Sequence, residues 1–404
     1  MQYCLWVAMR PSLIVGCDWS VWSGKRWSAA ARRVDDAVYE VAAPTAVHQT
    51  SSFFSDLVKS EPTGPILTGF DFPIGVPRLY AATAEITQFT ATLPHLGQGQ
   101  WADFYRLAEK ADEISIMRPF YPFRPGGTKR QHLVEGLGVR SPGDLLRACD
   151  HCTPTRSKAC SLFWTLGAKQ VGRAAIAGWR DVLVPALHQR LIAIWPFDGE
   201  LPEILETGRI VVAEIYPAET YSHIGLPRNF GKASRAGRKN QAAAIRTWCG
   251  RNKVALSKEV ANQIDDGFGD AGTGEDQFDS VIGALGMIES VNDPSPFAVP
   301  RDRAVRNIEG WILGMRASPG VAADEGTPAT VAGRQPRYSS RPVPETADDP
   351  PMDDVHARWC PACGRHPFVR WPLDWDGHAA YVCSGIEGDT PAERRRAYRE
   401  RYLS

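Results

Sequence analysis

Hydrophobic and polar positions in the first part of the chain alternate in short runs that are typical of strands. Leu13 to Cys17 is an apolar run that ends at Asp18, and the runs KRWSAAAR and AVYEVAA then predict a three-strand meander. We expect a helix over residues 51–59. The segment PILTGFDFPIGVP predicts another buried strand, which ends at Asp71 and is stopped by the following proline and glycine. Two predicted strands therefore end at an aspartate.

The pattern changes between residues 80 and 200, which are mostly helical or irregular and predict a large helical insertion. Within it, QVGRAAIAGWRDVLVPALHQRL has the pattern of one helix. Strand character returns in RIVVAEIYPAETY, where β-branched residues lead to Glu214. The last element, EDQFDSVIGALGMIESV, has apolar residues at helical spacing, and Asp276 and Asp279 lie three residues apart on one face. These elements predict an α/β fold with a mixed sheet flanked by helices.

Composition and charge narrow the class of protein. The chain has 404 residues, 43% of them hydrophobic, which is enough for a folded core and excludes a wholly disordered or fibrous protein. Its 46 basic residues balance 46 acidic ones, which argues against a histone-like binder but leaves a local basic groove possible. The apolar runs in the first twenty residues are too short and broken for a signal peptide or a membrane span. We expect a cytoplasmic protein without a membrane partner.

A shift in composition predicts the domain organisation. Residues 317–355 are dense in Pro, Gly, Ala, Asp and Ser and have almost no large apolar side chain, which predicts a disordered linker. The linker separates a main domain, residues 13–316, from a tail module, residues 356–404. Residues 1–12 are interpreted as an N-terminal extension.

Five acids in the main domain are the candidate catalytic residues. Carboxylates at strand ends and on one helix face can bind one or two Mg²⁺ or Mn²⁺ ions, which activate water in phosphodiester cleavage. The alternative is that each acid is a turn or helix-cap residue. The candidates are Asp18, Asp71, Glu214, Asp276 and Asp279.

The order of these motifs resembles a known fold and a known family. An acid after the first strand, a meander, a helix, two acid-bearing strands and a closing helix that begins D-x-x-D look like the ribonuclease H-like fold. More closely, VGCDWS, TGFDFPIGVP, VVAEIYPAETY, EDQFDSVIGALG and IEGWILG resemble the family called domain of unknown function 429. That family is a set of predicted nucleases with this fold, and the resemblance covers most of residues 13–316.

The closing helix also resembles the D-x-x-D-A-L helix of Holliday-junction resolvases, whose acids complete a metal site. This likeness implies that Asp18, Asp71 and Asp279 bind the metal. Glu214 would be an alternative third ligand or, like Asp276, a supporting one. The long insertion has no counterpart in the compact resolvases, so the resemblance implies a reaction class and no particular substrate.

The stretch RNFGKASRAGRKNQ forms a basic segment between the last two acidic motifs. Such a segment can bind phosphates beside a carboxylate-bound metal, or it can be an exposed loop of solvated charges. The candidate phosphate-binding residues are Lys232, Arg235, Arg238 and Lys239.

The tail module has the cysteine spacing of a zinc-ribbon-like module. Cys360 and Cys363 form a C-x-x-C pair, and His378 and Cys383 follow, which would complete a tetrahedral Zn²⁺ site. A module this small with few aliphatic residues needs a structural metal or a similar cross-link to fold. His366 is the rival fourth ligand, and the alternative is a flexible tail with incidental cysteines.

Together these features predict a metal-dependent nuclease or phosphodiesterase with nucleic acid as its partner. The alternative is a catalytically inactive adaptor for nucleic acid or protein on the same fold. A minor alternative is an actin-like or sugar-kinase-like phosphotransferase, which shares this core, but the paired glycine-rich phosphate motifs of that class are not evident. The oligomeric state does not follow from the sequence.

Overall fold

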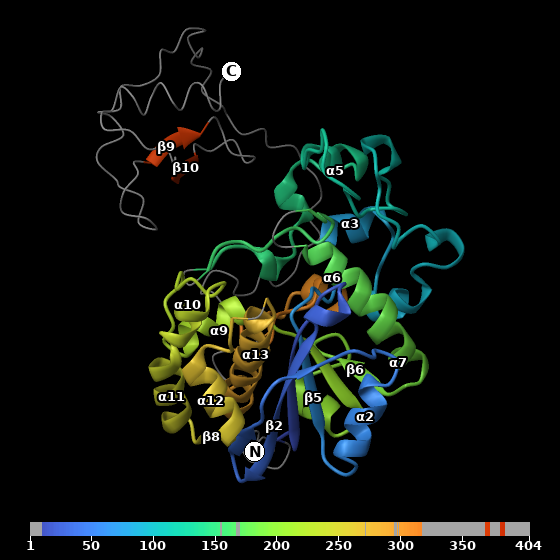
Figure 1. Cartoon of the computed structure of the whole chain (residues 1–404). Helices are drawn as coiled ribbons and strands as arrows, with labels where there is room; N and C mark the ends of the chain where they lie inside the picture. Colours follow the sequence, from blue (N-terminus) through green and yellow to red (C-terminus); the bar gives the residue numbers. More distant parts are fainter. Residues whose placement is uncertain are drawn as a thin grey trace, which may run out of the picture. The chain divides into compact units, whose positions relative to one another are not determined.

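The computed structural model (Figure 1) divides into two units, Met1–Asp324 and Glu325–Ser404, which are described separately. The structure describes residues 10–153, 156–166, 170–270, 272–294, 297 and 299–316 of the first unit, and the backbone of residues 368–371 and 380–383 of the second.

A mixed sheet of eight strands forms the centre of the first unit. The strand order is β6-β7-β5-β1-β2-β3-β8, and β4 pairs with β2. β1 is antiparallel to β2 and parallel to β5, which is in turn parallel to β7. The strands are β1 Leu13–Asp18, β2 Trp27–Asp35, β3 Val38–Val41, β4 Thr45–Ala46, β5 Ile66–Phe70, β6 Ile192–Ile194, β7 Ile210–Glu214 and β8 Val254–Leu256.

Helices cover both faces of this sheet, which confirms the predicted α/β class. In Figure 1, helices α9 to α13 lie on one side of the sheet, and α2 and α7 lie on the other. Among the helices that the structure describes, none combines the length and apolar character needed to cross a bilayer. The helices are α2 Phe53–Ser60, α3 Arg78–Thr83, α4 Phe89–Thr92, α5 Gln131–Gly136, α6 Val171–Gly178, α7 Val184–His188, α8 Leu201–Leu205, α9 Pro217–His223, α10 Arg235–Lys239, α11 Ala242–Arg251, α12 Lys258–Asp266 and α13 Gly274–Asn292.

Helix α13 packs directly on β1 and β2. Its apolar residues Phe278, Ile282 and Leu285 are buried, as their helical spacing predicts. Gly16 allows the close approach, because a Cβ atom there would lie 2.4 Å from the backbone nitrogen of Ala284. The first turns of α13 therefore lie near the carboxyl end of β1.

The insertion between β5 and β6 consists of short helices and turns. The long helix expected there is α6 and α7 joined by the π-helical turn η7, Trp179–Leu183. The fully buried Trp179 donates a hydrogen bond from Nε1 to the carbonyl of Pro73 at 2.7 Å. The insertion thereby braces the turn that follows β5. The 3-10 turns of the insertion are η2 Leu93–His95, η3 Gly99–Trp101, η4 Ala111–Glu113, η5 Pro142–Leu145 and η6 Ala148–Asp150. Outside the insertion, η1 Ser23–Lys25 is a 3-10 turn and η9 Val305–Glu309 is a π-helical turn.

In the second unit the structure describes one antiparallel pair of strands. β9 Phe368–Trp371 pairs with β10 Ala380–Cys383, and Cys383 stands opposite Phe368. Only the backbone of Cys383 is described, so the zinc site stays a prediction. The other predicted ligands, the rival ligand and the predicted linker lie outside the described residues: Cys360, Cys363, His366, His378 and residues 317–355.

Candidate metal centre

The carboxyl ends of β1 and β5 lie side by side, and an aspartate stands at each end. The parallel register pairs Cys17 with Phe70, so Asp18 and Asp71 are level with each other. The backbone N–H of Asp71 donates to the carbonyl of Cys17 at 3.2 Å, which extends the ladder to this point. Since Cys17 and Phe70 face the core beneath α2, alternation of side chains turns Asp18 and Asp71 toward the α13 side.

Asp276 and Asp279 join these residues from the first turns of α13. The charges of Asp71, Asp279 and Asp276 all act on Asp18, and the charge of Asp279 also acts on Asp71. Four of the five predicted acids therefore interact as one group, although no three of them have carboxylate oxygens all within 4.8 Å of one another. We call it the aspartate cluster: Asp18, Asp71, Asp276 and Asp279.

Burial and mutual repulsion raise pKa values in the aspartate cluster. Burial is the main cause for Asp18, whose pKa lies well above the usual range, and the charge of Asp71 adds to it. Burial also raises the pKa of Asp71 to about 7, although its Oδ1 accepts a hydrogen bond from the Trp19 backbone N–H at 2.7 Å. The contact between the two carboxyls raises the pKa of Asp18 further and lowers that of Asp71, so Asp18 is the partner that keeps a proton. The cluster thus favours any cation that replaces this proton.

Lys232 supplies a positive charge at one side of the cluster. Its Nζ lies 2.5 Å from Oδ2 of Asp279 and 2.9 Å from Oε1 of Glu275. Burial lowers the pKa of Lys232, but these two carboxylates raise it more, so the amine stays protonated. Tyr221 donates to Oδ1 of Asp279 at 2.7 Å. Both oxygens of Asp279 therefore have a partner.

Asp276, in contrast, has a carboxylate oxygen that is not satisfied. Its buried Oδ2 accepts no hydrogen bond from any residue that the structure describes. Burial raises the pKa of Asp276 to about 6, and the charges of Glu275 and Asp279 add to the effect. A buried oxygen without a donor is costly, and a cation beside it would remove that cost. The donors are carboxylate oxygens, so the chemistry of the cluster fits Mg²⁺ or Mn²⁺.

Glu214, the fifth predicted acid, lies on the other face of the sheet. The register pairs it with Phe70, one residue short of Asp71, so its side chain points to the opposite side. There Arg147 donates from Nη1 to Oε2 at 2.6 Å and from Nη2 to Oε1 at 2.7 Å. The backbone N–H of Ile74 also donates to Oε2 at 2.7 Å. The structure therefore does not bring Glu214 to the other four acids.

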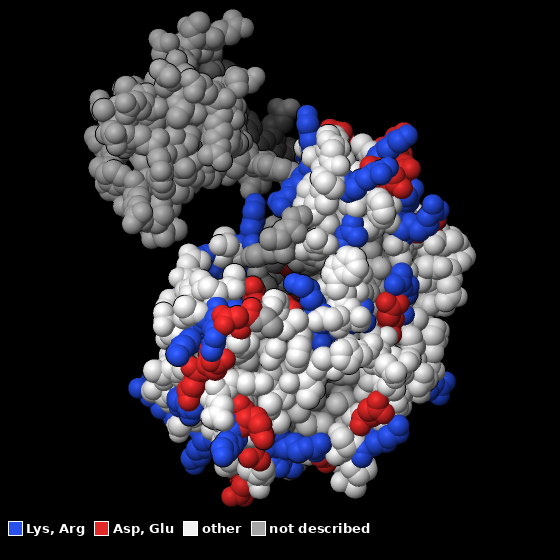
Figure 2. All heavy atoms as spheres, viewed as in Figure 1, with Lys and Arg blue, Asp and Glu red and all other residues white. Residues whose placement is uncertain are grey.

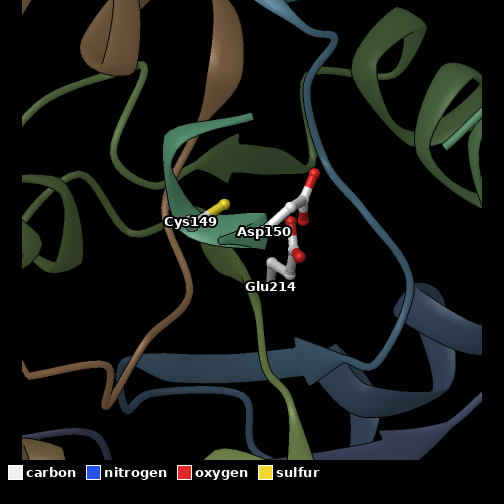
Figure 3. A group of neighbouring side chains, drawn as sticks. All are labelled: Cys149, Asp150 and Glu214. Atoms are coloured by element: carbon white, nitrogen blue, oxygen red, sulfur yellow. The ribbon is translucent and has the colours of Figure 1, made fainter. Parts of the chain in front are cut away.

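Figure 3 shows that Cys149, Asp150 and Glu214 point toward one another, with donor atoms within 4.8 Å. Such a set can hold a metal, but Arg147 already supplies a cation here. Its Nε and Nη2 donate to the two oxygens of Asp150 at 3.0 and 2.9 Å, in addition to its bonds to Glu214. Burial raises the pKa of the Cys149 thiol well above its usual value, which keeps it protonated. We interpret this group as a structural ion pair.

Further ion pairs and hydrogen bonds connect this group to Glu309, the last residue of η9. Glu309 accepts a hydrogen bond from Arg78 Nη2 at 2.7 Å and one from the backbone N–H of Ala148 at 3.2 Å. These contacts join the insertion to η9. We call the set the arginine network: Arg78, Arg147, Asp150, Glu214 and Glu309.

The predicted phosphate-binding residues have different environments. Lys232 lies at the aspartate cluster, as described above. Arg235 pairs with Asp266 and, at 2.6 Å, with Asp270. Arg238 is buried and donates to the carbonyls of three residues, and Lys239 is exposed. Figure 2 shows basic and acidic side chains mixed over α10 and α12, so this segment is no purely basic patch.

Several residues of the site were missed by the sequence reasoning. Glu275 adjoins the D-x-x-D motif and Tyr221 follows Glu214 in IYPAETY, so both stood inside recognised motifs. Lys25, which stabilises the charged form of Asp276, follows Asp18 after a short turn. No motif marks Arg147 as the partner of Glu214, because the two are 67 residues apart.

Comparison with known proteins adds no relative to this picture. The chain matches no protein-family model, no curated protein and no solved structure.

Proposed function

We propose that this protein is a Mg²⁺- or Mn²⁺-dependent nuclease that hydrolyses phosphodiester bonds in nucleic acid. The observation that carries the proposal is the aspartate cluster, in which carboxylates from β1, β5 and α13 repel one another with only partial neutralisation. Arginine donors to both oxygens of each carboxylate would make a structural role sufficient, as Arg147 does for Glu214. The unsatisfied oxygen of Asp276 is the second supporting feature.

The topology supports the more specific proposal of a ribonuclease H-like core. In the central order β3-β2-β1-β5-β7, β2 alone runs against the other four strands. Acids at the ends of β1 and β5 and on a helix packed against β1 suit this proposal, as do the motifs that resemble domain of unknown function 429. Fold alone does not define a reaction, so the site remains the main argument.

In this mechanism Asp18 and Asp71 would hold the metal ion with Asp276 as the third ligand, because Asp279 is already bonded to Lys232 and Tyr221. The three carboxylates do not lie within 4.8 Å of one another in the structure, so binding would have to draw them together around the ion. A bound Mg²⁺ would help to deprotonate water and balance charge on the phosphate. The Trp19 backbone N–H fixes the orientation of Asp71. Lys232 holds a positive charge beside the cluster, where it can bind a phosphate oxygen.

The test is metal-dependent cleavage of a panel of single-stranded, duplex and branched DNA and RNA. We expect Asp18→Asn and Asp276→Asn to lower the rate by more than about a hundredfold, because each removes a charge that the transition state needs. Asp56→Asn is the matched control, since Asp56 is an exposed acid on α2 that pairs with Lys59. Cleavage by Asp18→Asn at the wild-type rate would contradict the proposal.

A second readout does not depend on activity. Mg²⁺ at ten times its dissociation constant should raise the free energy of unfolding of the wild type by about 1.4 kcal/mol, and should not stabilise Asp18→Asn. A folded wild type that binds nucleic acid but cleaves no substrate in the panel would favour the adaptor.

We further propose that the tail module binds one Zn²⁺ through Cys360, Cys363, His378 and Cys383. Elemental analysis of the purified chain should find one equivalent of zinc, reduced in Cys360→Ser. His366→Ala should keep the metal if His378 is the fourth ligand.

A further inference from the structure

The turn between β1 and β2 exposes a tryptophan close to the aspartate cluster. Trp22 is 67% exposed, more than any other large hydrophobic residue that the structure describes. Single exposed apolar residues are common and need no special explanation. The case for a binding role therefore depends on how this turn is held and on what lies beside it.

The turn is held by specific contacts from a buried arginine. Arg26, 8% exposed, donates from Nε to the carbonyl of Ser20 at 2.6 Å and from Nη2 to that of Val21 at 3.0 Å. Its guanidinium also lies over the ring of Trp19, 5.1 Å from the centroid. The backbone N–H of Trp22 donates to Oγ of Ser20 at 3.2 Å. The indole of Trp22 is thus presented to solvent by a fixed backbone.

The turn between β1 and β2 lies next to the aspartate cluster. Trp22 follows Asp18 by four residues, and η1, which begins at the next residue, ends at Lys25. The charge of Lys25 acts on Asp276, so this lysine lies near the first turn of α13. An aromatic surface and a cation therefore stand together beside the same carboxylates. This combination is typical of sites that bind single-stranded nucleic acid.

We propose that Trp22 stacks on an unpaired base of a single-stranded nucleic acid while Lys25 contacts the neighbouring phosphate. In a duplex both faces of each base are covered by its neighbours, whereas a single strand leaves a face open for the indole. The inference rests on the proposed function, because it specifies the substrate class of that same site. It makes single-stranded regions, rather than intact duplexes or small phosphoesters, the preferred substrate.

The test is binding of fluorescently labelled oligonucleotides to the full chain, with Ca²⁺ in place of Mg²⁺ to prevent turnover. Trp22→Ala should weaken binding of a single-stranded 12-mer about tenfold, and Trp22→Phe should restore most of the affinity. The same Trp22→Ala change should have no effect on a 12-mer made of abasic nucleotides, which has phosphates but no bases. Lys25→Gln should weaken both oligonucleotides and reduce the salt dependence of binding.

Val34→Ala is the matched control, because Val34 is another exposed apolar residue, 56% exposed, near the far end of β2. It should leave the affinity unchanged. The stacking site is overturned if wild type does not bind the single strand, if Trp22→Ala binds it as tightly as wild type, or if Trp22→Ala loses equal affinity for the abasic strand. The thermal midpoint of each variant excludes unfolding as the cause.

These results separate the two proposals. If cleavage depends on Asp18 but binding does not change in Trp22→Ala, the nuclease proposal is supported and the stacking proposal is contradicted. If binding depends on Trp22 but no substrate is cleaved, the stacking proposal is supported and the nuclease proposal is contradicted.

Discussion

Two groups of buried acids lie on opposite faces of the same sheet, and they are neutralised to different degrees. In the arginine network, Arg147 donates to both oxygens of Glu214 and to both oxygens of Asp150. In the aspartate cluster, Lys232 forms a direct ion pair with Asp279, and the charge of Lys25 acts on Asp276. Every carboxylate oxygen of Asp150 and Glu214 in the first group accepts a hydrogen bond from Arg147, whereas Oδ2 of Asp276 in the second accepts none from any described residue. The second group therefore has capacity for another cation.

This difference separates a structural role from a binding role better than burial alone does. Removing a cation from a complete buried network leaves acids unpaired, which destabilises the fold. Removing an acid from an under-neutralised cluster relieves repulsion, which stabilises the fold at the expense of binding. The two groups should therefore respond to mutation with opposite signs.

The largest expected effect is loss of Arg147. Arg147→Met should lower the free energy of unfolding by about 3–5 kcal/mol, because Glu214 and Asp150 would remain buried without their cation. Urea denaturation followed by circular dichroism measures this change. The double variant Arg147→Met/Glu214→Gln should recover part of the loss. A single variant as stable as the wild type would show that the network is not essential to the fold.

The sequence was sufficient to predict the main elements of the fold. Alternating and helical apolar patterns located β1, β2, β3, β5, β7 and α13, and the meander and the buried face of the last helix are confirmed. The short strands β6 and β8 have three residues each and were not predicted, since such runs carry little periodic signal. The expected insertion helix is divided by a π-helical turn for which the pattern gave no sign.

The sequence was less informative about the site, for a reason visible in the register. Asp18, Asp71 and Glu214 all stand at strand ends, which gave them equal weight as ligands. Glu214 is level with Phe70, whereas Asp71 lies one residue further, and a shift of one residue reverses the face. Register depends on contacts between strands that are far apart in the sequence. It could not be deduced from the spacing within each motif.

A smaller effect of opposite sign is expected in the aspartate cluster. The pKa of Asp71 is about 7 in the fold, against about 3.9 in an unfolded chain, so the folded state binds more protons between these values. Stability of the wild type should therefore fall as the pH rises from about 4 to 7. Asp71→Asn removes this dependence and keeps an oxygen acceptor for Trp19. It should stabilise the fold on the order of 2 kcal/mol at pH 8 and by little at pH 4.

Denaturation of Asp71→Asn and wild type at both pH values, without divalent metal, is the measurement. Glu214→Gln is the comparison, because loss of a paired acid should destabilise the fold. A stabilisation of Asp71→Asn that is equal at both pH values would mean that repulsion between carboxylates is not its cause.

The smallest expected effect concerns Arg235, which, like Arg147, has two acidic partners. Arg235 pairs with Asp266 and Asp270, as Arg147 pairs with Asp150 and Glu214, but at the surface. Water screens exposed charges and solvates them when a partner is lost, so Arg235→Ala should leave the unfolding midpoint within experimental error. If Arg235 binds phosphate, the same variant should weaken nucleic-acid binding and reduce its salt dependence. A clear loss of stability would instead show that burial does not decide which of these ion pairs matter to the fold.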